Sequence, residues 1–169
     1  KIVAAFASGE VPDHCELGST WAPQFAGEGV LREVTEEAVP MRDAYLMWEP
    51  VTVGNEIYGF PWVVGTRALF YNKSLFAKAG LDSTRPPETW PELLTDAQRI
   101  KALGKDIYGY GENAGERHIL YKKYLPFAWS NMGSVLSADG KKAVLNSPED
   151  KEALECLVSL LPYAMIERQ

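Results

Sequence analysis

Apolar and polar positions follow helix-type and strand-type spacing in turn along the chain. The clearest helix signal begins at residues 89–92, which read Thr-Trp-Pro-Glu, a capping box with a proline inside the first turn. The apolar positions that follow recur at helical spacing, at Leu93, Leu94, Ala97, Ile100 and Leu103. The pattern therefore predicts an amphipathic helix that starts at this box.

Caps and turn residues predict further helices before and after this one. Residues 1–8 are typical of the end of an apolar-faced helix that Gly9 closes, because glycine readily adopts the left-handed C-cap conformation. Asn72 is expected to cap a short helix that ends at Gly80, and Ser147 before Pro148 to open the last helix. Three more helices are expected, through Gly27 with Ser19 or Thr20 as its cap, over 43–53 and over 117–131.

Strand signals lie between these helices. Residues 60–71 are rich in aromatic and β-branched side chains, which favours an extended backbone. Glycine at 54 and 140 indicates turns, the first between 51–53 and 56–58, the second inside a small hairpin over 134–145. Short strands are also expected at 14–18 and 106–111. This alternation of strands and helices predicts an α/β layered fold.

Composition and charge narrow the possible functions. The 169 residues are 46% apolar and 24% charged, and the net charge of −6 argues against a surface that binds DNA or RNA phosphates. Residues 1–60 hold 3 basic and 10 acidic groups, a net −7, whereas residues 61–169 hold 14 and 13, a net +1. Two lobes with separate surfaces would produce such a step, and so would one domain with a lopsided charge. No apolar run is long enough to cross a membrane.

Catalytic signatures are sparse in this sequence. It holds no G-x-S-x-G elbow, no H-E-x-x-H and no phosphate-binding glycine loop, so we expect neither a metal nor a cofactor. The two cysteines, Cys15 and Cys156, lack metal-type spacing and are expected to be free thiols. Glu112 and Glu116 could serve as a pair of catalytic carboxylates only if they faced one cavity.

The aromatic content is more informative. Five tryptophans, eight tyrosines and six phenylalanines make up 11% of the chain. Trp21, Trp62 and Trp129 lie beside polar or small residues, whereas Trp48 and Trp90 are assigned to the core. An aromatic face bordered by hydrogen-bonding groups suits a sugar, which has an apolar C–H face and a polar rim. These tryptophans therefore suit carbohydrate binding, and core packing stays the alternative for each one taken singly.

Four blocks in this order resemble a known family, the extracellular solute-binding proteins of family 1, which are the maltose-binding-type sugar receptors of ABC importers. The blocks are residues 7–31 with Ser-Thr-Trp at 19–21, residues 57–73 with Tyr-Gly-Phe-Pro-Trp, residues 87–93, and residues 108–111. The resemblance implies an α/β fold, part of a two-lobed periplasmic-binding-protein-like clamp of type II that is incomplete at both ends. Residues 1–60 would form a partial first lobe, 61–69 the hinge crossing and 70–169 a partial second lobe. The chain opens inside a helix, so we expect an export leader to lie upstream.

The family also implies a function and a set of binding residues. It implies a non-enzymatic receptor, periplasmic or extracellular, that holds a carbohydrate between its lobes and delivers it to ABC permease transmembrane subunits. Tryptophans would stack on sugar rings, and Glu112, Arg67 and Arg117 would make charge-assisted hydrogen bonds to hydroxyls. The full set of candidate ligand-binding residues is Ser19, Thr20, Trp21, Trp62, Thr66, Arg67, Glu112, Asn113, Arg117 and Trp129.

Two alternative functions stay open. A carbohydrate-active enzyme would use Glu112 and Glu116, and a protein-interaction module would use the exposed aromatic residues.

A lobe that lacks part of its sheet exposes strand edges and apolar surface. We therefore expect the 169 residues alone to bind sugar weakly or not at all, and to be able to self-associate.

Overall fold

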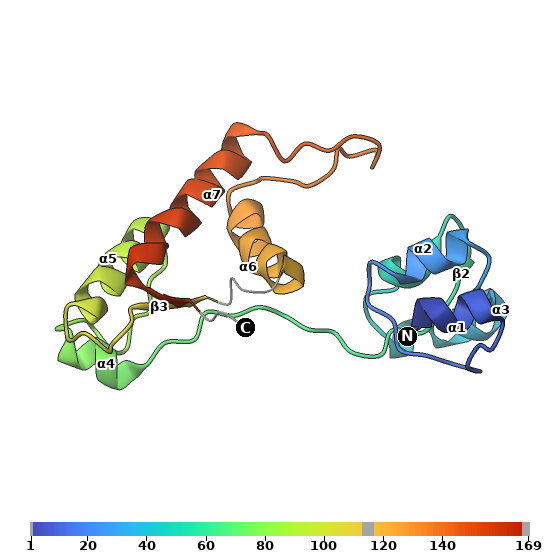
Figure 1. The fold of residues 1–169 in the computed structure, drawn as a ribbon, viewed down its shortest axis with the longest axis horizontal. Helices are drawn as coiled ribbons and strands as arrows, with labels where there is room; N and C mark the ends of the chain where they lie inside the picture. Colours follow the sequence, from blue (N-terminus) through green and yellow to red (C-terminus); the bar gives the residue numbers. More distant parts are fainter. Residues whose placement is uncertain (1, 113–116, 167–169) are drawn as a thin grey trace. The chain divides into compact units, whose positions relative to one another are not determined.

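The computed structural model describes residues 2–112 and 117–166 and divides the chain into two compact units, Lys1–Thr66 (unit 1) and Arg67–Gln169 (unit 2) (Figure 1). Both units combine helices with short strands, as the predicted α/β class requires. The boundary between the units follows Thr66. The assignment of residues 61–69 to a hinge, with partial lobes over 1–60 and 70–169, stays a prediction.

Unit 1 is built from short elements. They are α1 (Ile2–Ser8), α2 (Ala22–Gly27), α3 (Thr35–Ala38), two 3₁₀ turns (Val39–Ala44 and Glu49–Val51), β1 (Thr52–Val53) and β2 (Glu56–Ile57). The strands β1 and β2 pair in antiparallel fashion, with Thr52 opposite Ile57. Gly54 has φ +63° in the turn between them, so the predicted glycine turn at this hairpin is confirmed.

The core of unit 1 centres on Ile57, whose side chain is fully buried. Its backbone N–H donates to Thr35 Oγ1 at 2.8 Å, and its carbonyl accepts from the Val34 N–H at 2.7 Å. These two bonds attach the start of α3 to the edge of the hairpin. A second cluster forms around the buried Phe25, whose ring contacts Phe6 edge-on with centroids 4.9 Å apart.

Three predictions for unit 1 are wrong. Residues 14–18 are irregular and not a strand, because no neighbouring segment pairs with them in the part of the chain that the structure describes. The helix through Gly27 begins only at Ala22, with Trp21 at the N-cap position and no side-chain cap from Ser19 or Thr20. The helix expected over 43–53 is replaced by the 3₁₀ turns and β1, since Pro50 falls inside the expected helix, where it has no N–H to donate to the carbonyl of residue 46.

Unit 2 contains the longer helices. Its elements are α4 (Lys73–Lys78), α5 (Trp90–Lys101), β3 (Tyr110–Glu112), α6 (Arg117–Ser130), α7 (Pro148–Leu160), a 3₁₀ turn (Leu161–Tyr163) and β4 (Ala164–Ile166). The strands β3 and β4 are parallel, with Tyr110 opposite Ala164, and α7 packs against both α5 and α6 (Figure 1). The core side chains come mainly from these packed helices and include Ala97, Ile100, Ala128, Ala153, Leu157 and Leu160.

The predicted caps of unit 2 are confirmed. The Asn72 side chain accepts from the Ser74 and Leu75 N–H groups at 3.0 and 3.1 Å, and it starts α4. Thr89 and Glu92 form the reciprocal capping box of α5. The pKa of Glu92 lies below its ordinary value, first because the Glu88 N–H donates to its carboxylate and also because Arg85 is nearby.

The strands predicted from residue 60 onward are only partly present. Residues 60–71 carry neither helix nor sheet, and the strand expected over 106–111 is limited to β3, where β4 provides a partner. The hairpin over 134–145 is confirmed as a narrow turn, with a bridge between Leu136 and Ala143 and Gly140 at φ +70°. Strand propensity alone does not make a strand when nothing pairs with it.

A buried carboxylate connects α6 to the start of α7. Asp150 is 1% exposed and its Oδ1 accepts from the Tyr124 hydroxyl at 3.0 Å, while Oδ2 accepts from Ser147 Oγ at 2.9 Å and from the Ser134 N–H at 3.4 Å. The carboxylate also lies in the first turn of α7, where the helix dipole favours a negative charge. Side chains and backbone of unit 2 therefore donate a hydrogen bond to each of the two carboxylate oxygens of Asp150.

The hydrogen bond between Tyr124 and Asp150 predicts that unit 2 loses stability at alkaline pH. The pKa of Tyr124 is raised, first by burial and then by its hydrogen bond to Asp150. Because the folded protein holds this proton more tightly, the resulting stabilisation is fully present below the ordinary tyrosine pKa of 10.0 and is lost as the pH rises through the higher folded value. We expect the urea midpoint, followed by the helical circular dichroism, to fall as the pH rises through this range, and to fall less in Tyr124→Phe. Tyr108→Phe is the control, because Tyr108 lies in the same unit and is 43% exposed; an unchanged fall in Tyr124→Phe would contradict this assignment.

Candidate ligand-binding site

The unit 1 candidates lie in one turn before α2. The turn is closed by the Trp21 N–H, which donates to the Gly18 carbonyl at 2.8 Å. Ser19 and Thr20 are exposed, and Trp21 is 47% exposed with its ring edge-on to Phe25 at a centroid distance of 6.1 Å. The sequence thus brings two hydroxyl groups and one accessible indole together on a short, defined turn.

The next candidates lie on the segment that leads from unit 1 into unit 2. Trp62 is 79% exposed, and Thr66 and Arg67 are exposed as well. An indole with so much free surface adds nothing to a core, so its position is consistent with a contact to another molecule.

The unit 2 candidates are only partly described. Trp129 lies near the end of α6 and is 59% exposed. Glu112 ends β3 and Arg117 begins α6, but their side chains, like all of Asn113 and Glu116, lie outside the described residues. The alternative carboxylate pair of Glu112 and Glu116 is outside them too.

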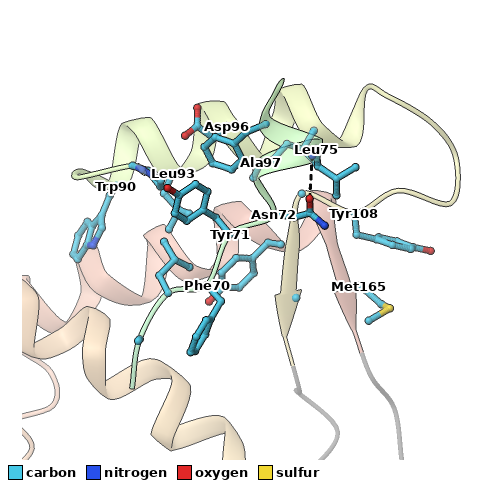
Figure 2. Close-up of a pocket in the computed structure, with 18 of the residues that line it drawn as sticks. Phe70, Tyr71, Asn72, Leu75, Trp90, Leu93, Asp96, Ala97, Tyr108 and Met165 are labelled. Atoms are coloured by element: carbon cyan, nitrogen blue, oxygen red, sulfur yellow. Dashed lines mark hydrogen bonds between the residues drawn. The ribbon is translucent and has the colours of Figure 1, made fainter. Parts of the chain in front are cut away.

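Unit 2 also holds a large open hollow that the sequence did not indicate. Its volume is about 820 Å³, and it lies between the 67–76 segment, α5, α6 and the β3–β4 pair (Figure 2). Aromatic side chains supply much of its wall, namely Phe70, Tyr71, Trp90, Tyr108, Tyr110 and Phe127. Among the candidate residues whose side chains are described, Arg67 alone contributes to this wall.

Trp90 shows why the hollow was missed. It was assigned to the core because it begins a well-capped helix, and it does pack on Phe127 with centroids 6.1 Å apart. It is nevertheless half-buried and forms part of the wall of the hollow (Figure 2). The aromatic pair Phe70 and Tyr71 was a signal for this wall, but it was interpreted only as strand propensity.

Charged groups also border the hollow. Burial raises the pKa of Asp96, and the nearby Glu92 carboxylate adds to this effect. Arg67, Lys122 and Lys123 supply positive charge to its wall. Lys101 is not part of the wall, but its ammonium lies 4.2 Å from the centroid of the Tyr108 ring, a cation–π contact. The hollow therefore combines aromatic faces with both signs of charge.

Side chains that commonly bind metals are dispersed over the described part of the chain. They contain no cluster of three or more histidine, cysteine, aspartate or glutamate side chains that could hold a metal ion. Cys15 and Cys156 are free, and burial raises the pKa of the Cys156 thiol. None of the described helices combines the length and the apolar character needed to cross a membrane.

Comparison with known proteins identifies the class of this chain. Residues 1–168 match the family model of bacterial extracellular solute-binding proteins, so the chain belongs to this family. Its fold is that of a type II periplasmic binding protein, as the family resemblance had implied.

Two relatives illustrate the match in sequence. A Brucella abortus protein named only as a binding protein is 31% identical over 165 residues, 95% of this chain and 39% of its own length. The sn-glycerol-3-phosphate-binding periplasmic protein UgpB of the same species is 47% identical over 51 residues, 30% of this chain and 12% of its own.

A solved structure extends the comparison. The ABC transporter solute-binding protein of Thermotoga lettingae, bound with α-D-tagatose, is 33% identical with a TM-score of 0.79, over 96% of this chain and 43% of its own. The chain thus spans about two fifths of the length of the first relatives it matches. All three named proteins are binding proteins.

Proposed function

We propose that this chain is part of the substrate-binding component of an ABC importer, which captures a carbohydrate between two lobes and delivers it to the transmembrane permease subunits. One observation carries the proposal: Trp21, Trp62 and Trp129 are 47%, 79% and 59% exposed on a chain of the solute-binding family. The protein would act in the periplasm or outside the cell, as the periplasmic relative UgpB supports.

The chemistry of these side chains suits a sugar. The exposed indoles offer flat apolar faces to the C–H groups of a sugar ring. Ser19 and Thr20 can each donate and accept a hydrogen bond at the rim, beside Trp21. Arg67 and Arg117 would donate to hydroxyl oxygens, and Glu112 and Asn113 would accept from hydroxyl groups; Thr66 would add a further hydroxyl. The ligand would leave unchanged, since the proposed role involves binding without turnover.

A panel of ligands tests this proposal. The protein would be prepared at the full length of its relatives and assayed by thermal shift with monosaccharides, malto-oligosaccharides, polyols and glycerol phosphates. A ligand at 100 times its dissociation constant should stabilise the folded protein by about 2.7 kcal/mol. The glycerol phosphate arm is included because of the 47% identity with UgpB over 51 residues. Hydrolysis of any sugar in the panel, or no shift with any of its members, would overturn the proposal.

Loss of the exposed indoles should weaken ligand binding. Trp62→Ala and Trp21→Ala are each expected to raise the dissociation constant of the ligand identified in the panel by roughly 10- to 100-fold, as for other exposed aromatic anchors. Titration calorimetry on the protein at full length would measure this change. Leu46→Ala is the control, because Leu46 is 77% exposed, nearly as much as Trp62, and lies outside the proposed site. Equal binding by all three variants and the parent would show that the indoles do not contact the ligand.

A further inference from the structure

Pro126 interrupts the helix that carries Trp129. α6 runs from Arg117 to Ser130, and Pro126 lies inside it. A proline has no N–H to donate to the carbonyl four residues earlier, and its ring crowds that carbonyl, so the helix is weakened at this point. Trp129, a candidate ligand-binding residue, lies beyond the proline in the last turn. α6 by itself therefore holds this turn less firmly than an uninterrupted helix would.

Side-chain hydrogen bonds attach α6 to the first turns of α7 on both sides of the proline. Before the proline, the Tyr124 hydroxyl lies 3.0 Å from Asp150 Oδ1 and 3.1 Å from the Asp150 carbonyl oxygen. After it, Asn131 Nδ2 donates to the Glu149 carbonyl at 3.0 Å and to the Glu152 carboxylate at 2.9 Å. We call Tyr124 and Asn131, together with their partners on α7, the α7 brace.

The backbone after Trp129 is fixed as well. The Gly133 N–H donates to the Ala128 carbonyl at 2.8 Å, and the Met132 N–H donates to the Trp129 carbonyl at 3.2 Å, the pattern of a left-handed helix cap. Met132 has φ +65° in this cap, a conformation that costs free energy for a residue other than glycine. Such a conformation persists where the surrounding bonds enforce it. Asn131, which stands between Trp129 and this cap, supplies two of those bonds.

The brace holds one face of α6 and leaves Trp129 on another. Tyr124 and Ala128 are four residues apart and share a face of the helix, on which Ala128 is only 1% exposed. Trp129 lies about 140° around the helix axis from Tyr124, because successive residues are rotated by about 100°. Its side chain is accordingly more than half exposed. Attachment of the buried face to α7 therefore also sets the direction in which the indole points.

We propose that Tyr124 and Asn131 are positioning residues of the ligand site, which attach both sides of Pro126 to α7 and so hold the Trp129 indole ready to stack on a sugar ring. This inference rests on the proposed function, in which Trp129 contacts the carbohydrate. An indole on a fixed turn loses less conformational freedom on binding than one on a loose turn. The brace thus raises the affinity without touching the ligand.

Fluorine NMR of the ligand-free protein tests the positioning itself. The protein, prepared at the full length of its relatives, would be labelled with fluorotryptophan, and Trp129→Phe would assign the Trp129 signal. We expect Asn131→Ala and Tyr124→Phe each to shift or broaden this signal, because each removes a bond on one side of the proline. The signals of Trp21 and Trp62 should stay unchanged, since both residues lie in unit 1.

Ligand affinity tests the consequence of this positioning. Each variant would be titrated with those monosaccharides, malto-oligosaccharides, polyols or glycerol phosphates that stabilise the parent protein. Asn131→Ala should raise their dissociation constants by roughly 3- to 10-fold, the cost of ordering one loosened side chain. In a Trp129→Ala background the same change should have no further effect, because the brace acts only through the indole.

Asn72→Ala is the matched control. Asn72 also makes two hydrogen bonds at a helix end of unit 2, with the Ser74 and Leu75 N–H groups at the start of α4. Its loss should therefore destabilise unit 2 through a missing cap. It should leave both the Trp129 signal and the dissociation constants at their parent values.

Three results would overturn the proposal. They are a Trp129 signal that neither Asn131→Ala nor Tyr124→Phe changes, an affinity that Asn131→Ala leaves at the parent value, and a loss of affinity that is the same in Asn131→Ala and Asn72→Ala. The last result would show that affinity follows the stability of unit 2. Failure of the proposed function has a different signature, namely no binding of any panel member or an unchanged affinity in Trp129→Ala.

Discussion

Replacing Gly109 by alanine is expected to destabilise unit 2 more than a methyl group added to any other glycine that the structure describes. A Cβ at this position would lie 2.6 Å from the Ala97 Cα and 2.5 Å from its carbonyl carbon, which are backbone atoms of α5 that cannot rotate away. The Gly109 N–H also donates to the Tyr163 carbonyl at 2.9 Å, so the loop cannot shift without losing that bond. We expect a loss of about 3 kcal/mol or more in the free energy of unfolding.

Urea unfolding followed by circular dichroism would measure this loss, since α5, α6 and α7 provide most of the regular helix of the described chain. Gly111→Ala is the matched control, because Gly111 lies two residues further along the same segment and a Cβ there has no heavy atom within 4 Å. Equal unfolding midpoints for the two variants would show that the approach of the loop to α5 can relax.

The contact at Gly109 also illustrates how far the sequence could predict this fold. Helix ends that depend on neighbours in sequence, such as the Thr89 box, the Asn72 cap and the Ser147–Pro148 start, were predicted correctly because all partners lie within a few residues. The close packing of Gly109 on Ala97 joins residues from different elements. A pattern among neighbouring residues in the sequence cannot predict such a contact.

The same contrast between local signals and contacts of distant residues holds for the strands and for the candidate site. Residues 14–18 and 60–71 have strand composition but no partner in the described chain, so the sequence predicted a preference that pairing does not realise. The exposed tryptophans could be recognised from their polar neighbours. The hollow of unit 2 could not, because its wall combines residues such as Phe70, Trp90 and Tyr108 that are distant in sequence.

Asp150→Ala is expected to have an effect of similar size on unit 2. The change leaves the Ser134 N–H and the Ser147 hydroxyl without their carboxylate partner, and it removes the negative charge from the first turn of α7. Hydrogen bonds to a buried charge contribute more than neutral ones, so we expect a loss of about 3 kcal/mol in the free energy of unfolding. Urea unfolding, as for Gly109, would measure it.

A double-mutant cycle separates the Tyr124 bond from the other contributions of Asp150. Tyr124→Phe removes a hydroxyl that lies 3.0 Å from Asp150 Oδ1, and the two changes together should cost less than the sum of each alone, by about 1 kcal/mol or more. Glu149→Ala is the control, since Glu149 is exposed and lies in the same turn of α7, so its loss should change stability by about 0.5 kcal/mol or less. Additive effects of Asp150→Ala and Tyr124→Phe would contradict a bond between the Tyr124 hydroxyl and the Asp150 carboxylate; the bond from this hydroxyl to the Asp150 backbone carbonyl, 3.1 Å long, is unaffected by Asp150→Ala. A cost of Glu149→Ala that matched the cost of Asp150→Ala would show that charge at the helix start, rather than the buried network, stabilises unit 2.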